Sequence, residues 1–234
     1  MEQRKLCVLS QNMLKIIAAV CMVTDHIGAE LFPDLTILRI IGRLSFPLFS
    51  YFIYEGCKYT HNKLRYFLQV FALGILCIIG YYVYSREIFL NVLITFSLSI
   101  CVLCAVKFFK GQACAGVRQG ALSAILSIAC ILAVFVLCRR VKIDYGFFGI
   151  MLPVFAEIFD DGSKQNKVMP LIGFSVGLLL LAIDRGGTQY FGLFAIILLT
   201  LYSGERGKWR MKYFFYWFYP LHLIAIGAVS ALIG

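Results

Sequence analysis

Apolar runs of about 20 residues, the length that spans a bilayer as a helix, follow one another along most of the chain. This pattern predicts an all-α fold, a polytopic transmembrane helical bundle of about nine helices, with a range of eight to ten. The sixth and eighth runs are short, so one of them is a candidate re-entrant segment. The predicted spans are residues 11–31, 36–56, 64–84, 88–108, 120–138, 144–160, 168–184, 189–203 and 213–233.

The polar gaps between these runs contain no soluble domain, so we expect a single integral membrane domain over residues 1–234. The first apolar run is not expected to be a removable signal peptide. It is too long, it lacks a small-residue cleavage site, and it carries the adjacent Asp25 and His26.

The composition and the placement of charge support a membrane protein. Hydrophobic residues make up 61% of the chain and charged residues 15%, against about 25% charged in soluble domains. Although the net charge is +10, the basic residues lie between apolar runs, so no nucleic-acid partner is expected. Successive gaps fall alternately on the two sides of the membrane. The gaps on the same side as the N-terminus hold 14 Lys and Arg, and the gaps on the opposite side hold five. This bias predicts a cytoplasmic N-terminus in the plasma (inner) membrane.

The nine cysteines predict neither disulfides nor a metal site. Most lie in or beside apolar runs, where a thiol behaves as a small buried hydrophobe. The C-x-x-C formed by Cys101 and Cys104 falls inside a predicted helix. Asp25, His26 and His222 lack a metal-ligand spacing, so no metal is expected.

Asp25 and His26 are ionisable residues inside an apolar run, where they are costly and usually functional. We expect His26 to act as a general base or a nucleophile. Neighbours on a helix point about 100° apart, so Asp25 is expected to pair with Arg39 or Arg43 rather than with His26. The alternative is a structural ion pair beside a hydrogen-bonded core histidine.

The second span carries Arg39 and Arg43 on one helical face, where they can pair with Asp25 or hold a phosphate or carboxylate. Gly42 permits a close helix approach. Pro47 removes the backbone bond to the Arg43 carbonyl and is expected to kink the helix. The alternative is an arginine that extends to the lipid headgroups.

Polar residues of three further spans are predicted at a similar depth, from the midplane outward, which fits one shared cavity. Each also has a structural interpretation: hydrogen bonds between helices, a helix cap, or an interfacial aromatic belt. These candidate substrate-binding residues are Asn91, Thr95, Asp144, Tyr145, Tyr219 and His222.

A basic loop follows the second span and contains Lys58, Lys63 and Arg65. Its charge can attract the phosphates of an acyl-carrying coenzyme. The alternative is a topology determinant that contacts lipid headgroups.

Taken in order, these segments resemble the TraX family of integral membrane acetyltransferases, named for the protein that N-acetylates pilin subunits of conjugative pili. Each motif is weak alone, but the ordered set covers almost the whole chain. The resembling segments are Asp25 to Gly28, Arg39 to Pro47 with Phe49 and Glu55-Gly56, Asn91 to Leu93 with Thr95, Asp144 to Gly146, and Phe218 to His222.

The resemblance implies acetyl transfer from acetyl-CoA, entering from the cytoplasm, to an amine or hydroxyl of an extracytoplasmic protein, peptide or glycan. It implies His26 as base or acetyl carrier, and Asp25 as its charge partner or orienter. Arg39 and Arg43 would hold charge near the acyl donor or the oxyanion. The residues implied to line the site are Asn91, Asp144, Tyr219 and His222.

Two other functions stay open from the residues. Asp25, Arg43 and His222 could form an ion or proton relay in a small transporter, although no inverted repeat is visible in the sequence. The chain could also be a non-catalytic membrane protein that assembles surface polymers.

Overall fold

The computed structural model describes residues 8–113, 117–163, 166–207 and 211–233. It confirms the all-α class, and seven of the described helical spans are long and apolar enough to cross a membrane. Two shorter apolar helical segments accompany them, at the sixth and eighth predicted spans. The helices are α1 (Gln11–Glu30), α2 (Thr36–Gly42), α3 (Ser45–Tyr59), α4 (Lys63–Ser85), α5 (Val92–Ala113), α6 (Val117–Arg140), α7 (Gly146–Phe159), α8 (Val168–Arg185), the 3₁₀ helix η2 (Gly187–Phe194), α9 (Ala195–Thr200) and α10 (Lys212–Ile233).

The chain divides into two compact units. Unit 1 is residues 1–49 and 185–234, and unit 2 is residues 50–184. Each unit is described by itself. The expectation of a single domain over residues 1–234 therefore stays a prediction.

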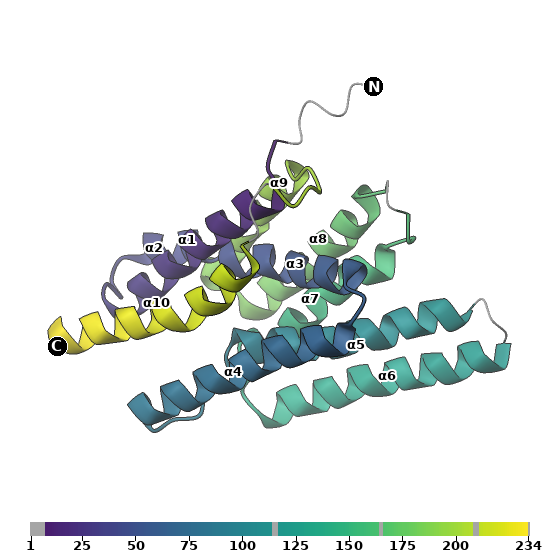
Figure 1. Cartoon of the computed structure of the whole chain (residues 1–234), viewed down its shortest axis with the longest axis horizontal. Coiled ribbons are helices and arrows are strands. Elements are labelled where there is room, and N and C mark those ends of the chain that lie inside the picture. The colour runs from purple at the N-terminus through teal and green to yellow at the C-terminus, as the bar shows by residue number, and fades with distance from the viewer. Residues whose placement is uncertain (1–7, 114–116, 164–165, 208–210, 234) are drawn as a thin grey trace. The chain divides into compact units, whose positions relative to one another are not determined.

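In unit 1, α1 packs along α2 and also contacts α10, so the first and the last helix of the chain lie in one bundle (Figure 1). Ser10 is the N-cap of α1, because its side-chain oxygen accepts a hydrogen bond from the Met13 amide, 3.4 Å away. The 3₁₀ helix η2 contacts both α2 and α9. Unit 1 therefore brings together residues from the first two and the last two predicted spans.

The predicted kink near Pro47 is confirmed, because the span expected at 36–56 is two helical segments, α2 and α3, separated at Arg43 and Leu44. Pro47 has no amide hydrogen to donate to the Arg43 carbonyl four residues earlier. A second proline, Pro220, lies inside α10 without ending that helix.

In unit 2, α4, α5 and α6 run side by side, and α7 packs against α5 (Figure 1). The close approach of α7 and α8 depends on Gly173 and Gly177. A Cβ on Gly177 would lie 2.7 Å from the Phe155 ring, and one on Gly173 would meet the Phe155 carbonyl. Small residues are typical where membrane helices approach closely.

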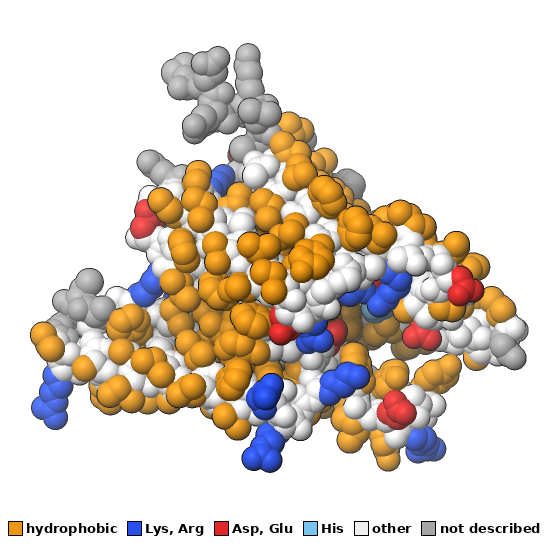
Figure 2. Space-filling model, turned by 180° about the vertical axis from the view of Figure 1, so that it is seen from behind, with side chains coloured by type: hydrophobic (Ala, Val, Ile, Leu, Met, Phe, Trp, Pro, Cys, Tyr) orange, Lys and Arg blue, Asp and Glu red, His pale blue; other side chains and the backbone are white. Residues whose placement is uncertain are grey.

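Hydrophobic side chains cover most of the face seen in Figure 2. Large apolar side chains are exposed along the helices of both units, for example Leu126 and Leu132 on α6 and Ile79 on α4. A soluble monomer rarely exposes so much contiguous apolar surface. Together with the length of the helices, this surface identifies a multi-pass membrane protein.

Candidate functional site

Asp25 on α1 is held by two arginines of the next helical span. Arg43 Nη2 donates to both carboxylate oxygens, at 2.8 and 3.1 Å. Arg39 Nη1 lies 3.0 Å from Asp25 Oδ2 and 3.0 Å from the Asp25 carbonyl oxygen. The prediction that Asp25 pairs with an arginine, made from helical geometry, is therefore confirmed.

Two glycines allow α1 and α2 to approach closely enough for these bonds. A Cβ on Gly42 would overlap the Asp25 carboxylate, and one on Gly28 would lie 2.7 Å from the Leu38 Cβ. The absence of side chains at both positions lets the carboxylate lie against the α2 backbone. Gly42 is thus part of the site, as the sequence predicted for a close helix contact.

Asp25, Arg39 and Arg43, which we call the Asp25 cluster, carry an excess of positive charge. Only 14% of the Asp25 side chain and 13% of the Arg43 side chain are exposed, against 33% for Arg39. One carboxylate faces two guanidinium groups, so these three side chains together carry a formal charge of +1. Such a site attracts an anion or an oxygen that develops negative charge.

His26, which follows Asp25, contacts His222 of α10. His26 Nδ1 lies 3.0 Å from His222 Nε2, and the two rings are nearly parallel, with centroids 5.0 Å apart. The other ring nitrogen of His222, Nδ1, lies 2.8 Å from the Phe218 carbonyl oxygen. Sequence reasoning singled out both histidines for function, and the fold places them in direct contact.

These contacts determine where the protons lie when both rings are neutral. The Phe218 carbonyl can only accept, so His222 Nδ1 carries a hydrogen and His222 Nε2 has the lone pair. His222 Nε2 then accepts from His26 Nδ1. The remaining nitrogen, His26 Nε2, keeps its lone pair and is available as a base or a nucleophile. His222 thus orients His26, a role expected for Asp25.

Tyr219 and Phe218 surround His222 on α10. The Phe218 ring stacks on His222 at 5.2 Å between centroids, and Tyr219 meets it nearly edge-on at 5.6 Å. His222 and Tyr219 are 7% and 8% exposed, whereas His26 is half-buried. The aromatic packing fixes the His222 ring and leaves His26 as the more accessible member of the pair.

Gln189 of η2 joins the site, although the sequence analysis did not select it. Its Oε1 accepts a long bond of 3.5 Å from Arg43 Nη1. The side chain is buried, with 4% exposed. In the sequence Gln189 stands at the edge of the eighth predicted span beside two glycines, where a polar residue resembles part of a loop. Only the packing of η2 against α2 reveals its position.

The four predicted substrate-binding residues Asn91, Thr95, Asp144 and Tyr145 lie in unit 2, where each makes structural bonds. Asn91 accepts from the Leu93 amide at the start of α5 and donates to the Gly74 carbonyl, both at 3.0 Å. Thr95 Oγ1 donates to the Asp144 carbonyl at 2.5 Å. The residue preceding α7 is Tyr145, in a left-handed conformation, so Asp144 is not its cap. These contacts favour the helix-joining interpretation, and substrate binding at these positions stays a prediction.

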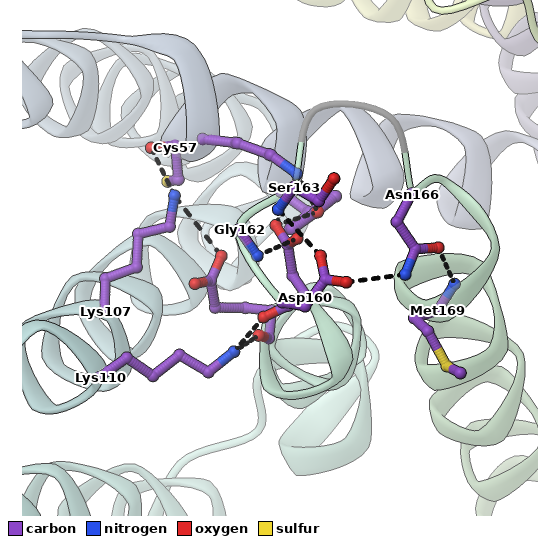
Figure 3. Close-up of polar contacts among 12 residues, drawn as sticks. Cys57, Lys107, Lys110, Asp160, Gly162, Ser163, Asn166 and Met169 are labelled. Carbon is purple, nitrogen blue, oxygen red and sulfur yellow. Dashed lines mark hydrogen bonds and ion pairs between the residues drawn. The ribbon is translucent and has the colours of Figure 1, made fainter. Parts of the chain in front are cut away.

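A second polar group, which we call the lysine cluster, lies where α3 and α7 end beside α5 (Figure 3). Lys58 Nζ is 2.7 Å from Asp160 Oδ2, and the Tyr54 hydroxyl donates to the same oxygen at 2.6 Å. Lys58, predicted to bind coenzyme phosphate, therefore already has a carboxylate partner. Lys63, predicted for the same role, is half-buried at the start of α4. The members of the cluster are Lys58, Lys107, Lys110, Glu157 and Asp160.

Two lysines of α5 bind the carbonyl groups at the ends of the neighbouring helices. Lys107 Nζ donates to the Cys57 carbonyl at 3.2 Å and lies 3.5 Å from Glu157 Oε2. Lys110 Nζ donates to the Glu157 carbonyl and, at 2.6 Å, to the Asp160 carbonyl. Positive charge at a helix C-terminus is stabilising. The lysine cluster thus fastens α3 and α7 to α5.

We expect Asp160→Asn to lower the free energy of unfolding by about 1–3 kcal/mol at neutral pH. Burial alone would raise the pKa of Asp160, but hydrogen bonds from Lys58, Tyr54 and the Gly162 amide hold it below its ordinary value of 3.8. The stabilisation is therefore present above that value and lost as the pH falls below it.

Denaturant unfolding in detergent at several pH values measures this effect. The difference between wild type and Asp160→Asn should shrink as the pH falls below 3.8, because the carboxyl of the unfolded state is protonated first, and it should vanish below the lowered pKa of the folded state. Asp161→Asn is the matched control, because Asp161 is exposed. An equal loss of stability in both variants would contradict the assignment.

Within the described residues, no group of three or more His, Cys, Asp and Glu side chains is placed to hold a metal ion. The seven cysteines in the described part of the chain are free thiols. The candidate site is made up of the Asp25 cluster, the His26–His222 pair and Gln189.

Comparison with known proteins gives a family match over nearly the whole chain. A family model described as TraX protein matches residues 10–230. A probable fimbrial assembly protein FimC, serogroup H1, of Dichelobacter nodosus is 26% identical over 90% of this chain and 91% of its own length. An uncharacterized protein of Rickettsia prowazekii is 52% identical over 42 residues, and this match spans 17% of that protein. No solved structure matches the chain.

Proposed function

Because this chain belongs to the TraX family, we propose that it is a membrane acetyltransferase that uses acetyl-CoA as donor. The observation that supports this most directly is the His26–His222 pair, in which His26 Nε2 keeps a lone pair. The histidine pair stands next to the Asp25 cluster, whose three side chains together carry a formal charge of +1. A base beside a site that stabilises negative charge is the arrangement that acyl transfer requires.

In the proposed reaction, an acceptor amine or hydroxyl attacks the thioester carbonyl carbon, and His26 Nε2 removes the acceptor proton. The carbonyl π electrons move to oxygen, and the positive charge of Arg39 and Arg43 favours this oxyanion. When the intermediate collapses, the carbon–sulfur bond breaks and coenzyme A leaves as a thiolate. The proton on His26 is passed to that thiolate, which restores the neutral pair.

The proposed acceptor is an amine or hydroxyl on a subunit of a surface fibre. The relative from Dichelobacter nodosus is named a probable fimbrial assembly protein, which supports an acceptor of this kind. With the N-terminus on the cytoplasmic side of the inner membrane, the basic loop also faces the cytoplasm, and the coenzyme would enter from that side. Since Lys58 is paired with Asp160, Lys63 and the exposed Arg65 carry the attraction for its phosphates.

The same relative's name also favours a second candidate, a non-catalytic role in fibre assembly. The two functions differ in their dependence on the histidines. An assembly role depends on the fold alone, so fibre formation would persist in a folded protein without His26. An acetyltransferase would lose modification of the fibre subunits in that variant.

Purified protein in liposomes, supplied with acetyl-labelled coenzyme A and pilin subunits, tests the proposal. We expect release of free coenzyme A and transfer of the label to the subunits. Mass spectrometry of envelope material should also show acetylated subunits in cells that make the protein and not in cells that lack it. Absence of coenzyme A release at millimolar acetyl-CoA, or ion flux without the coenzyme, would contradict the proposed function.

A further inference from the structure

Gln189 presents a buried donor that the described protein leaves unpaired. Its Nε2 has no hydrogen-bond partner among the described residues, while its Oε1 faces Arg43. The orientation of the amide is fixed by chemistry, because a guanidinium group can only donate and the amide oxygen must face it. The NH₂ group is therefore directed away from Arg43. An unpaired buried amide costs about 1–3 kcal/mol, which calls for an explanation.

The local backbone positions this donor. Gly186 and Gly187 have φ values of 66° and 53°, which let the chain turn sharply after α8 into η2. In a 3₁₀ helix, residues three apart lie above one another, so Gly192 follows Gln189 on the same face. A Cβ on Gly192 would lie 3.4 Å from Gln189 Nε2. Gly192 thus places no side chain against the amide.

Arg43 links Gln189 to the rest of the site. One end of its guanidinium group contacts Gln189 Oε1, and the other holds Asp25, which adjoins His26. A movement of Arg43 as charge develops would be transmitted to the Gln189 side chain. The amide, the arginines and the histidine pair all belong to unit 1.

We propose that Gln189 is a catalytic residue whose Nε2 donates a hydrogen bond to the thioester carbonyl oxygen of the acyl donor. This rests on the proposed function. As the acceptor attacks, the carbonyl π electrons move to oxygen, and the amide hydrogen stabilises the resulting oxyanion. The hydrogen bond from Gln189 weakens again when the carbon–sulfur bond breaks and the neutral carbonyl re-forms. The ligand class is an acyl thioester, bound through its carbonyl group.

Gln189→Glu tests this role, because it keeps the shape and the acceptor toward Arg43 while removing the donor. We expect kcat for acetyl transfer to fall by about 10²- to 10³-fold with a nearly unchanged KM for acetyl-CoA. Gln189→Met, which also lacks the donor, should show a similar loss. Tyr190→Phe, at an exposed neighbour in η2, should retain wild-type kinetics.

The outcomes separate this inference from the proposed function. If Gln189 served only to accept the hydrogen bond from Arg43, the Gln189→Glu variant would still do so, since a carboxylate accepts from Arg43 at least as well as an amide. Wild-type kcat in that variant would therefore overturn the role of Gln189 and leave the acetyltransferase proposal intact. A wild-type protein that transfers no acetyl group would overturn both. Thermal unfolding in detergent confirms that each variant is folded.

Discussion

His26→Ala should lower the rate of acetyl transfer by about 10²- to 10⁴-fold, the usual contribution of a general base. The variant loses the nitrogen, Nε2, that keeps a lone pair when His222 donates to the Phe218 carbonyl. His222→Phe should cause a smaller loss, because the base remains but its ring is no longer oriented. The measurement is single-turnover label transfer from acetyl-CoA in liposomes.

The control for this prediction is His61→Ala, which removes an exposed histidine and should leave the rate unchanged. Added imidazole should partly restore transfer in His26→Gly, because a free base can occupy the vacated space. Undiminished transfer by folded His26→Ala protein would exclude His26 from the chemistry. A labelled acetyl group that stays covalently on the wild-type protein would assign His26 as acetyl carrier.

Asp25→Leu should lower the free energy of unfolding by about 3–5 kcal/mol, the cost of leaving a largely buried partner charge uncompensated. The change removes the carboxylate that binds Arg43 at 2.8 Å and Arg39 at 3.0 Å. Two guanidinium groups then lie close together without the carboxylate of Asp25 between them. Unfolding of the purified protein in mixed micelles, titrated with denaturing detergent, measures the loss.

Replacing all three charges, as in Asp25→Leu combined with Arg39→Leu and Arg43→Leu, should recover much of this stability. Apolar replacements of a buried ion pair are often neutral or stabilising. Glu30→Leu, at the exposed end of α1, is the matched control and should change stability by about 0.5 kcal/mol or less. A triple variant as unstable as Asp25→Leu would show that the loss comes from packing, not charge.

The fold class followed from the sequence because a single dimension, the thickness of the bilayer, sets the length of each apolar run. The break at Arg43 was equally local, since Pro47 removes one identified hydrogen bond. Sequence reasoning also favoured an arginine over His26 as the partner of Asp25. Helical geometry separates adjacent side chains, and a buried carboxylate requires a cation. These inferences needed no knowledge of which helices touch.

Other parts of the site required the tertiary structure. The availability of Lys58 could not be read from its position in a basic loop, because its partner Asp160 lies about 100 residues away at the end of another helix. Asn91, immediately before α5, and Thr95, in its first turn, are four residues apart and looked suited to a substrate. Whether they bind a ligand or a neighbouring backbone depends on how closely α4 and α7 pack against α5.

The sequence alone determined a multi-pass helical protein and the pairing of Asp25 with arginine, because spans and local geometry are encoded within a few turns of helix. Only the tertiary structure placed His222 against His26, 196 residues away, and turned Gln189 toward Arg43. Contacts between distant segments depend on the packing of whole helices, which side-chain spacing does not specify. The protonation of the histidine pair, and with it the identity of the available base, follows from those contacts.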